Sequence, residues 1–191
     1  MKKITVFNFI SVDGYYAGPN DEIDWFKAIG KDAEYDAYTH SQSSSNHTLM
    51  FGHTTYDMMK SFWPTPMAME SDPHMAKIMN ESMKIVFSKE LQHSDDIPGW
   101  DDVIILRDIR AEEILKLKRE SAHDITILGS GSIVQQLSNL GLIDSYQLMV
   151  VPIVLGAGKS LFANAKSLNL KLLEAKSFKN GVVSLQYEPM R

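Results

Sequence analysis

The chain has 191 residues, of which 44% are hydrophobic, and a formal net charge of −5. This apolar content is enough for one domain of ordinary size to bury a core without disulfides or metal. The absence of cysteine excludes a disulfide framework, a thiol nucleophile and Cys-ligated metal centres, and it fits a reducing cytoplasm.

The charge pattern and the N-terminus also limit the function classes. A negative net charge without a block of Lys or Arg argues against a nucleic-acid surface. The segment behind Met1-Lys2-Lys3 alternates and contains Asn8 and Asp13, so it predicts a strand rather than a signal peptide. No apolar run approaches the roughly 18 residues that cross a bilayer. We therefore expect a soluble, cytoplasmic protein with one domain over residues 1–191.

The first half of the chain predicts strands followed by helices. Ile4–Ser11 alternates as a strand, and Gly14–Asp21 is expected to be an irregular loop because its glycines and proline disfavour regular structure. Asp32 caps a predicted helix that runs through about His40, and residues 41–46 form a connector.

A second strand and two helices follow. Thr48–Phe51 is a predicted strand and Thr54–Met59 a short helix. Trp63–Pro66 breaks the chain, and Asp72-Pro73 starts a helix that is expected to end at about Met83.

The second half continues this alternation and then changes. The predicted elements are the strands Lys84–Phe87 and Val103–Leu106, the helix Ala111–Glu120, the strand Ile125–Leu128, the helix Ile133–Leu140 with Gly141 as its left-handed C-cap, and the strand Ser145–Val151. Two further strands, Leu170–Ser177 and Val182–Glu188, flank the hairpin signal Asn180-Gly181. The order predicts an α/β fold whose mostly parallel sheet ends in antiparallel strands.

Three apolar runs stop at turns of small residues, namely Asp13-Gly14, Gly52–Thr55 and Gly129–Ser132. The second and third turns open into predicted helices. Backbone N–H groups at helix N-termini then converge where parallel strands end, which is how an α/β sheet builds an anion-binding crevice. The pattern predicts a phosphorylated cofactor.

Neither glycine motif matches a standard nucleotide fingerprint. In Gly129–Ser132 the third glycine of a dinucleotide motif would fall at Val134, so a diphosphate site and a plain tight turn both stay open, and a standard Rossmann dehydrogenase is rejected. Gly156–Ser160 ends like a Walker A loop, but its first glycine would stand at Ile153 and no clear helix follows. We expect a glycine turn near a ligand there.

The histidines and methionines favour structural roles. The six histidines are scattered, so no metal site is expected. Met75, Met79 and Met83 recur every fourth position and predict a buried helix stripe rather than a flexible binding surface.

Two carboxylates in the first loop are candidate catalytic residues. Asp13 and Asp24 lie near Tyr15, Tyr16 and Trp25 in sequence. A carboxylate beside aromatic rings at a crevice can orient or protonate a substrate, whereas Asp13-Gly14 in isolation is a turn former. Both interpretations stay open for Asp13.

An ordered series of motifs spans nearly the whole chain, namely Ser11–Gly18, Asp24-Trp25, Leu49–Tyr56, Lys84–Ser88, Ile127–Gly131 and Pro152–Lys159. Together they resemble the dihydrofolate-reductase-like family, and most closely the C-terminal reductase domain of bacterial bifunctional riboflavin-biosynthesis proteins and its stand-alone relatives. The resemblance implies a three-layer αβα fold with a central sheet of about eight strands, and a homodimer.

The resemblance also implies NADPH across the carboxyl edge of the sheet and assigns the contacts as follows. The adenosine-side phosphates would bind Gly52, His53, Thr54 and Thr55. Ser88 and Lys89 would lie near the 2′-phosphate. The diphosphate would bind Gly129, Ser130, Gly131, Ser132 and Ile133, and the nicotinamide would border Tyr16 and Ala17. Candidate substrate contacts are Tyr15, Trp25 and Gly156.

The implied activity is the reduction of a small heterocyclic substrate by NADPH, as in 5-amino-6-(5-phosphoribosylamino)uracil reductase. His53 stands where dihydrofolate reductases usually carry arginine, so the choice between NADPH and NADH stays open. One alternative is a pterin reductase of the dihydrofolate reductase type, with Glu34 or Asp36 in the region of its acidic residue. Another is a non-catalytic nucleotide-binding or regulatory module on the same fold.

Overall fold

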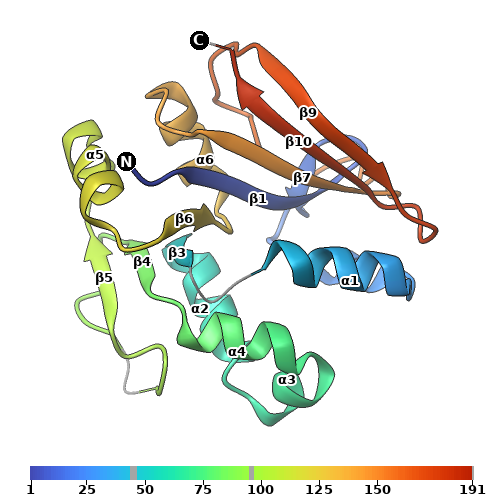
Figure 1. Cartoon of the computed structure of the whole chain (residues 1–191), viewed down its shortest axis with the longest axis horizontal. Coiled ribbons are helices and arrows are strands. Elements are labelled where there is room, and N and C mark those ends of the chain that lie inside the picture. The colour runs from blue at the N-terminus through green and yellow to red at the C-terminus, as the bar shows by residue number, and fades with distance from the viewer. Residues whose placement is uncertain (44–46, 95–96, 191) are drawn as a thin grey trace.

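The structure is a computed structural model that describes residues 1–43, 47–94 and 97–190. Its centre is an eight-stranded sheet with the order β5-β4-β3-β6-β1-β7-β10-β9 (Figure 1). The strands are β1 (Ile4–Ser11), β3 (His47–Gly52), β4 (Lys84–Phe87), β5 (Val103–Leu106), β6 (Asp124–Ile127), β7 (Ser145–Val151), β9 (Leu170–Ser177) and β10 (Val183–Pro189). Neighbours from β5 to β7 pair in parallel, and β10 pairs antiparallel with β7 and β9. The expected mostly parallel sheet with antiparallel C-terminal strands is confirmed.

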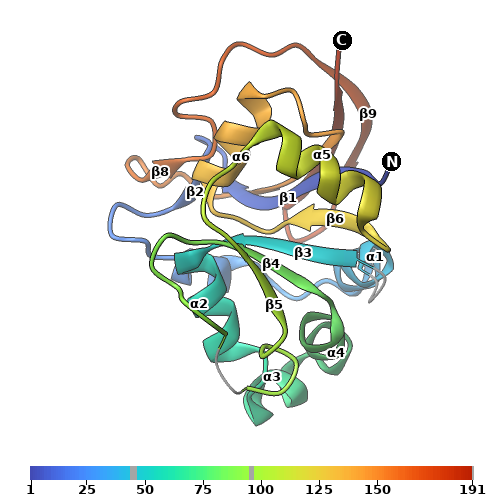
Figure 2. The same cartoon turned by 90° about the vertical axis from the view of Figure 1, so that its left-hand side faces the viewer.

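Helices cover both faces of this sheet (Figure 2). On one side lie α1 (Ala33–Gln42), α2 (His53–Phe62), α3 (Pro66–Ser71) and α4 (Pro73–Glu81), and on the other lie α5 (Ala111–Glu120) and α6 (Gly131–Asn139). Because helices cover both faces of the sheet, side chains of β1 that point to opposite faces pack in two different core clusters. Ile4 and Val6 join the core under α5 and α6, whereas Phe7 and Phe9 pack with Tyr35 of α1.

The first loop contains more regular structure than its sequence predicts. Tyr15–Ala17 forms strand β2, which pairs antiparallel with β8 (Lys159–Ser160). The expectation of an irregular loop over 14–21 is wrong because the partner strand lies about 140 residues away in the sequence, beyond the reach of local propensity. A short 3₁₀ helix, η1 (Asp24–Ala28), follows. In the described part of the chain, the element that follows β8 is the strand β9 (Leu170–Ser177).

Prolines also start a helix where the sequence predicts only a break. Pro66 opens α3, and the Thr65 hydroxyl caps it by accepting a hydrogen bond from the Ala68 N–H at 3.3 Å. The helix predicted to reach Met83 ends at Glu81, so Met83 lies outside it and is 48% exposed. The prediction that Met83 belongs to a buried helix stripe with Met75 and Met79 is therefore wrong.

Other local predictions are close. Asp32 caps α1 by accepting hydrogen bonds from the N–H groups of Glu34 and Tyr35. Helix α1 extends to Gln42, two residues into the expected connector, and positions 44–46 of that connector lie outside the described residues. Gly141 and Gly181 have positive φ angles of 66° and 86°, as the helix end and the hairpin require. Among the described residues, no helix is both long and apolar enough to span a bilayer.

A buried lysine holds the amino end of β4. The Lys84 Nζ donates hydrogen bonds to the carbonyls of Asn80 (3.1 Å), Ser82 (2.6 Å) and Gly99 (2.6 Å), and it lies 4.6 Å from the ring centroid of Trp100. Burial lowers the pKa of Lys84 to about 8, against a smaller opposing effect of Asp101. The ammonium group thus joins the end of α4 to the loop before β5.

We expect Lys84→Met to lower the free energy of unfolding by about 1–3 kcal/mol, because buried carbonyls lose their donor. The pKa of Lys84 is about 8 in the folded chain against 10.5 for an ordinary lysine. The unfolded chain therefore binds more protons between these values, and the wild type gains stability relative to the variant as pH rises through that range. Urea unfolding at pH 7.5 and 9.5 measures this, with the exposed Lys77→Met as control for the loss of one charge. An equal wild-type advantage at both pH values would contradict the assignment.

Candidate functional site

The turns after β3 and β6 touch each other at the carboxyl edge of the sheet. The Gly52 N–H donates to the Gly129 carbonyl at 3.0 Å. A Cβ at Gly52 would lie 2.7 Å from the Ser130 Oγ. Glycine at position 52 therefore permits the close approach of the two turns that the sequence predicts to bind phosphates.

The two helices that start at these turns have no side-chain cap among the described residues. Gly52 is the N-cap of α2 and Ser130 that of α6, and neither first turn contains an acidic residue. By contrast, Asp32 and Asp72 cap α1 and α4. A helix start without a cap or an acidic residue leaves N–H groups and the positive end of the helix dipole for another anion.

Tyr16 lies over the start of α6. A Cβ at Gly131 would approach the Tyr16 Cε1 to 2.5 Å, and the Tyr16 hydroxyl accepts a hydrogen bond from the Gly131 N–H. Burial raises the pKa of Tyr16, so the hydroxyl is protonated at neutral pH. An anion at the Gly131 amide would therefore compete with this hydroxyl, whereas Ser132 is exposed.

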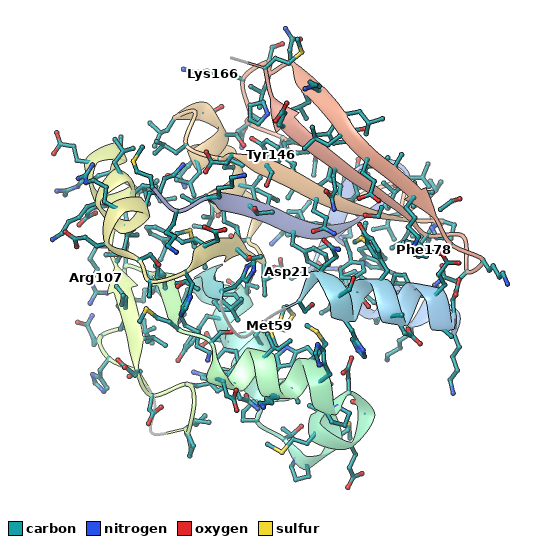
Figure 3. All side chains as sticks on the ribbon, in the orientation of Figure 1. Asp21, Met59, Arg107, Tyr146, Lys166 and Phe178 are labelled. Atoms are coloured by element: carbon teal, nitrogen blue, oxygen red, sulfur yellow. The ribbon has the colours of Figure 1, made fainter. Side chains whose placement is uncertain are left out.

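The turn after β4 forms the outer corner of the edge. The buried Ser88 Oγ accepts hydrogen bonds from two N–H groups of its own turn, and Arg107 donates to the Ser88 carbonyl at 3.0 Å. Lys89 is exposed and lies 3.8 Å from Asp108. His53 lies 3.2 Å from Asp57. Figure 3 places Arg107 at the β5 side of the molecule. Lys89 and Arg107 are thus cationic side chains of this corner, and Asp108 lies beside Lys89.

An aromatic cavity of about 380 Å³ opens beside these turns. Six rings line it, namely Phe7, Phe9, Tyr16, Phe26, Phe62 and Trp63. Four thioethers complete much of the wall, namely Met58, Met59, Met75 and Met79. Thr54, Thr55 and Gly129 connect it to the turns described above. Its volume lies within the range of small-molecule sites.

Two polar side chains of the aromatic cavity stand out. The Asn8 Oδ1 is buried and has no hydrogen-bond partner in the described part of the chain. Asp21 has a positive φ of 66° and forms an ion pair with Lys159. The aromatic cavity is therefore apolar except for one amide, one paired carboxylate and the hydroxyls of Tyr16, Thr54 and Thr55.

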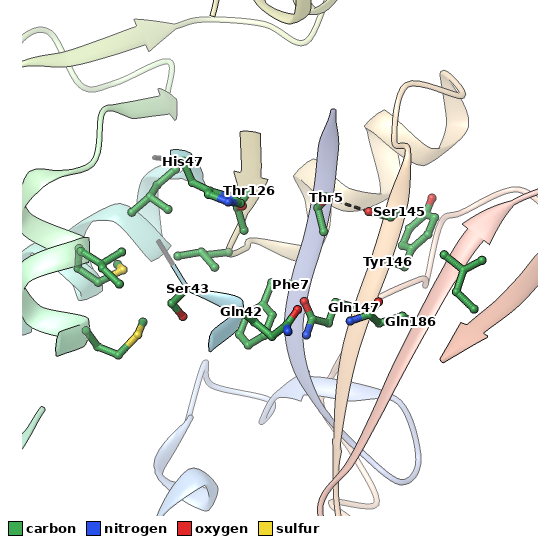
Figure 4. A pocket seen from close by; sticks show the side chains of 16 residues that line it. Thr5, Phe7, Gln42, Ser43, His47, Thr126, Ser145, Tyr146, Gln147 and Gln186 are labelled. Carbon is green, nitrogen blue, oxygen red and sulfur yellow. Dashed lines mark hydrogen bonds between the residues drawn. The ribbon is translucent and has the colours of Figure 1, made fainter. Parts of the chain in front are cut away.

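A second, polar cavity of about 260 Å³ lies on the same sheet face, between α1 and α4 (Figure 4). Its hydrogen-bonding side chains include Thr5, Gln42, Ser145, Gln147 and Gln186. Phe7, Leu128, Met75 and Met79 line both cavities. These four side chains form a wall that the two cavities share. Met75 and Met79 therefore pack in the core, as the sequence predicts, and also line both cavities.

Asp13 is tied into its loop rather than turned towards either cavity. Its carboxylate accepts hydrogen bonds from the Ser11 hydroxyl (2.6 Å) and from the N–H groups of Leu155 (3.2 Å) and Gly156 (2.8 Å). The bond from Ser11 is the largest cause that lowers the pKa of Asp13. The carboxylate thus joins the first loop to residues 155–156.

The structure does not bring together the second predicted catalytic residue, Asp24, and the predicted substrate contacts Tyr15, Trp25 and Gly156 in one cavity. Trp25 is buried behind Phe26, with ring centroids 4.2 Å apart. Tyr15 lies in β2 opposite Ser160, and Asp24 is exposed in η1. Within the described residues, neither these groups nor Gly156 line a cavity.

Several site residues escape the sequence analysis. Asn8, Met58 and Phe62 line the aromatic cavity, and Arg107 supports the turn after β4. Arg107 directly follows β5, so its position at a strand end is a signal that the sequence contains. Asn8 has a weaker signal, as an amide inside an apolar strand. Over the ranges that the structure describes, no three His, Asp or Glu side chains form a metal-holding group.

Comparisons with known proteins agree with this geometry. The family model of the RibD C-terminal domain matches residues 2–184. The chain is 29% identical to the uncharacterized protein YyaP of Bacillus subtilis (strain 168) over 179 residues, which cover 93% of this chain and 90% of YyaP.

Solved structures share the fold. A protein of Shewanella sp. PV-4, provisionally described as a riboflavin biosynthesis protein, aligns over 100% of both chains with a TM-score of 0.75 and 22% identity. The diaminohydroxyphosphoribosylaminopyrimidine deaminase/5-amino-6-(5-phosphoribosylamino)uracil reductase of Thermotoga maritima aligns with a TM-score of 0.68 and 14% identity, over 99% of this chain and 57% of that one. Dihydrofolate reductase from Enterococcus faecalis, complexed with NADP(H), aligns over 99% of this chain and 97% of that one, with a TM-score of 0.61 and 11% identity. On the match that spans residues 2–184, the chain belongs to the RibD C-terminal domain family.

Proposed function

We propose that this protein is an NADPH-dependent reductase of a small heterocyclic substrate, similar to the reductase half of the bifunctional riboflavin proteins. The observation that carries the proposal is the contact between two uncapped helix starts directly beside an apolar cavity. Uncapped helix starts favour a diphosphate, and an apolar cavity at the same edge favours a ring brought against a nicotinamide. The reductase and NADP(H) named for the structural relatives support this choice.

The residues of this chain would bind and orient the cofactor. The first amides of α2 and α6 would hold its phosphates, and Ser88, Lys89 and Arg107 would lie near a 2′-phosphate. NADPH supplies the hydride, and the reduced acceptor also takes up one proton. The rings and thioethers of the aromatic cavity would exclude water from the transfer.

Asp13 fits a positioning role in this reductase. Its three hydrogen bonds hold residues 155–156 against the end of β1, next to the β2–β8 pair that leads into Tyr16 and Ala17. We propose that the Asp13 carboxylate keeps this loop in place at the mouth of the aromatic cavity.

The alternatives have weaker support. Glu34 forms an ion pair with Lys176 of β9 at 3.0 Å, and among the described residues neither Glu34 nor Asp36 lines a cavity. A pterin reductase of the dihydrofolate reductase type therefore has no candidate acid on α1. A non-catalytic module would bind NADPH without oxidising it, so NADPH oxidation with pyrimidine and pterin acceptors separates the two classes.

We expect Ser132→Asp to weaken binding of both NADPH and NADH by about tenfold or more, because a carboxylate in the first turn of α6 repels a diphosphate. An acidic residue at this helix position interacts favourably with the helix dipole, so the melting temperature should not fall. Isothermal titration calorimetry measures both dissociation constants. The matched neutral variant Ser132→Asn should bind like the wild type. Equal affinities in the Asp and Asn variants would place the diphosphate elsewhere.

In the wild type the Asp13 carboxylate accepts hydrogen bonds from the N–H groups of Leu155 and Gly156. Asp13→Asn replaces one of its oxygens by an NH₂ group, which cannot accept a hydrogen bond. We expect a melting temperature lower by a few degrees and a higher KM for the acceptor, with NADPH affinity close to that of the wild type. The folded pKa of Asp13 is below 3.8, so the stabilising contribution is present above about pH 4 and is lost as pH falls through the folded pKa. Thermal unfolding at pH 7 and pH 3 should show a wild-type advantage at pH 7 that shrinks at pH 3. An unchanged melting temperature with a lower kcat would instead favour direct catalysis by Asp13.

We also propose a homodimer, with the edge strand β9 as its interface. Leu172 is 50% exposed on β9, which ends the sheet and, among the described residues, has one side without a partner strand. Light scattering at micromolar concentration should give twice the chain mass of 21.5 kDa. Leu172→Glu should shift this mass towards the monomer, and Leu168→Glu, which lies outside β9, is the matched control. A wild-type monomer would exclude the dimer.

A further inference from the structure

We propose that the acceptor of this reductase is a flat, uncharged compound without a phosphate group, which binds between the rings and thioethers of the aromatic cavity with its polar group at the Asn8 amide. The proposal rests on the proposed function for the role of the cofactor. It departs from the phosphoribosyl substrate named for the Thermotoga maritima relative.

The charge of the aromatic cavity is the first argument. Among the described residues that line it there is no Lys, Arg or His, and its one carboxylate, Asp21, is paired with Lys159. A phosphate that leaves water needs cations or several aligned donors, since an uncompensated buried charge costs many kcal/mol. The aromatic cavity therefore disfavours a phosphorylated acceptor.

The polar cavity gives a phosphate no better place. Its titratable lining groups are His47 and Tyr146, and burial lowers the pKa of His47, so the imidazole is neutral at pH 7. The His47 Nδ1 already lies 2.8 Å from the Thr126 hydroxyl. The amides of Gln147 and Gln186 supply uncharged hydrogen-bonding groups. An acceptor that extends past Phe7 and Met79 into this cavity would therefore carry a hydroxyl or amide tail.

One cation, Lys159, lies beside the wall of the aromatic cavity, where its charge is balanced by Asp21, and two others lie farther out. Lys89 and Arg107 occupy the outer corner beside Ser88, where the cofactor's own phosphate would bind. Neither residue lines the aromatic cavity or the polar cavity. The wall around the acceptor thus contains no unpaired charge among the described residues, whereas Lys89 and Arg107 lie at the proposed cofactor corner.

The shape and the Asn8 amide define the acceptor further. Phe9 and Phe26, which pack edge-to-face with ring centroids 5.1 Å apart, and Trp63 contribute aromatic surface to the wall, and aromatic surface favours contact with a planar ring. The buried Asn8 Oδ1 has no partner in the part of the chain that the structure describes. A hydroxyl or N–H on the acceptor would satisfy this amide, because an unpaired buried oxygen carries a desolvation cost.

The experiment compares 2-naphthol with 2-naphthyl phosphate, two flat probes that differ by the phosphate. Fluorescence titration with and without saturating NADP⁺ measures both affinities. We expect one 2-naphthol per chain and an affinity at least tenfold above that of 2-naphthyl phosphate. Equal or tighter binding of the phosphate ester to the wild type would overturn the proposal.

Two variants locate the site. Asn8→Leu should lower the affinity for 2-naphthol several-fold and leave the affinity for naphthalene unchanged. Met58→Lys places a cation in the wall of the aromatic cavity and should improve binding of 2-naphthyl phosphate at least tenfold. The matched control is Met67→Lys on α3, which is 71% exposed and outside both cavities and should leave both affinities unchanged. Unchanged affinities in both cavity variants would show that the probes bind elsewhere and would refute the proposal.

Calorimetric titration of NADPH in the same preparation keeps the two hypotheses distinct. A protein that prefers 2-naphthol and does not bind NADPH or NADH would contradict the proposed function and leave the uncharged cavity supported. A protein that binds NADPH and prefers the phosphate ester would retain the proposed function and refute the inference.

Discussion

The parallel pairing of β1, β3, β4 and β6 is the constraint on which the site depends. Parallel strands deliver their carboxyl ends to one edge, so the turns that follow them must meet there. The hydrogen bond from the Gly52 N–H to the Gly129 carbonyl, at 3.0 Å, is the point of contact. Because α2 and α6 start from these turns, one backbone contact positions both helix N-termini.

The aromatic cavity follows from an unequal strand length at the same edge. β6 pairs with β1 up to the match of Ile127 with Val6, whereas β1 continues to pair with β7 as far as Ser11. Beyond Val6, no strand of the described residues pairs with the side of β1 that faces β6. Asn8 lies at this opening, where its amide has no partner among the described residues. The sheet thus leaves space for a ligand where its regular hydrogen bonding ends.

Local sequence signals predict the elements whose physics is local. Continuous apolar runs such as Lys84–Phe87 predict buried parallel strands, and Asp32 or Gly141 mark helix ends by their own backbone chemistry. The β2–β8 pair and the tie from Asp13 to Gly156 escape prediction, because each joins residues about 140 positions apart. The meeting of the turns after β3 and β6 is predictable, since glycine turns at strand ends are visible in the sequence. The wall of the aromatic cavity is not, because it combines side chains from many elements.

This difference explains why family membership says more about the cofactor than about the acceptor. The edge at which we propose the cofactor uses backbone N–H groups and glycines, and in this chain Gly52 permits the contact between the turns after β3 and β6. The acceptor wall uses side chains such as Met58, Phe62 and Trp63, which can change without disturbing the parallel pairing. A chain can therefore keep the fold of this family while the side chains of the aromatic cavity, and with them the acceptor that we propose, differ from those of a relative. The identity of the acceptor must then be read from the wall of this cavity rather than from the fold.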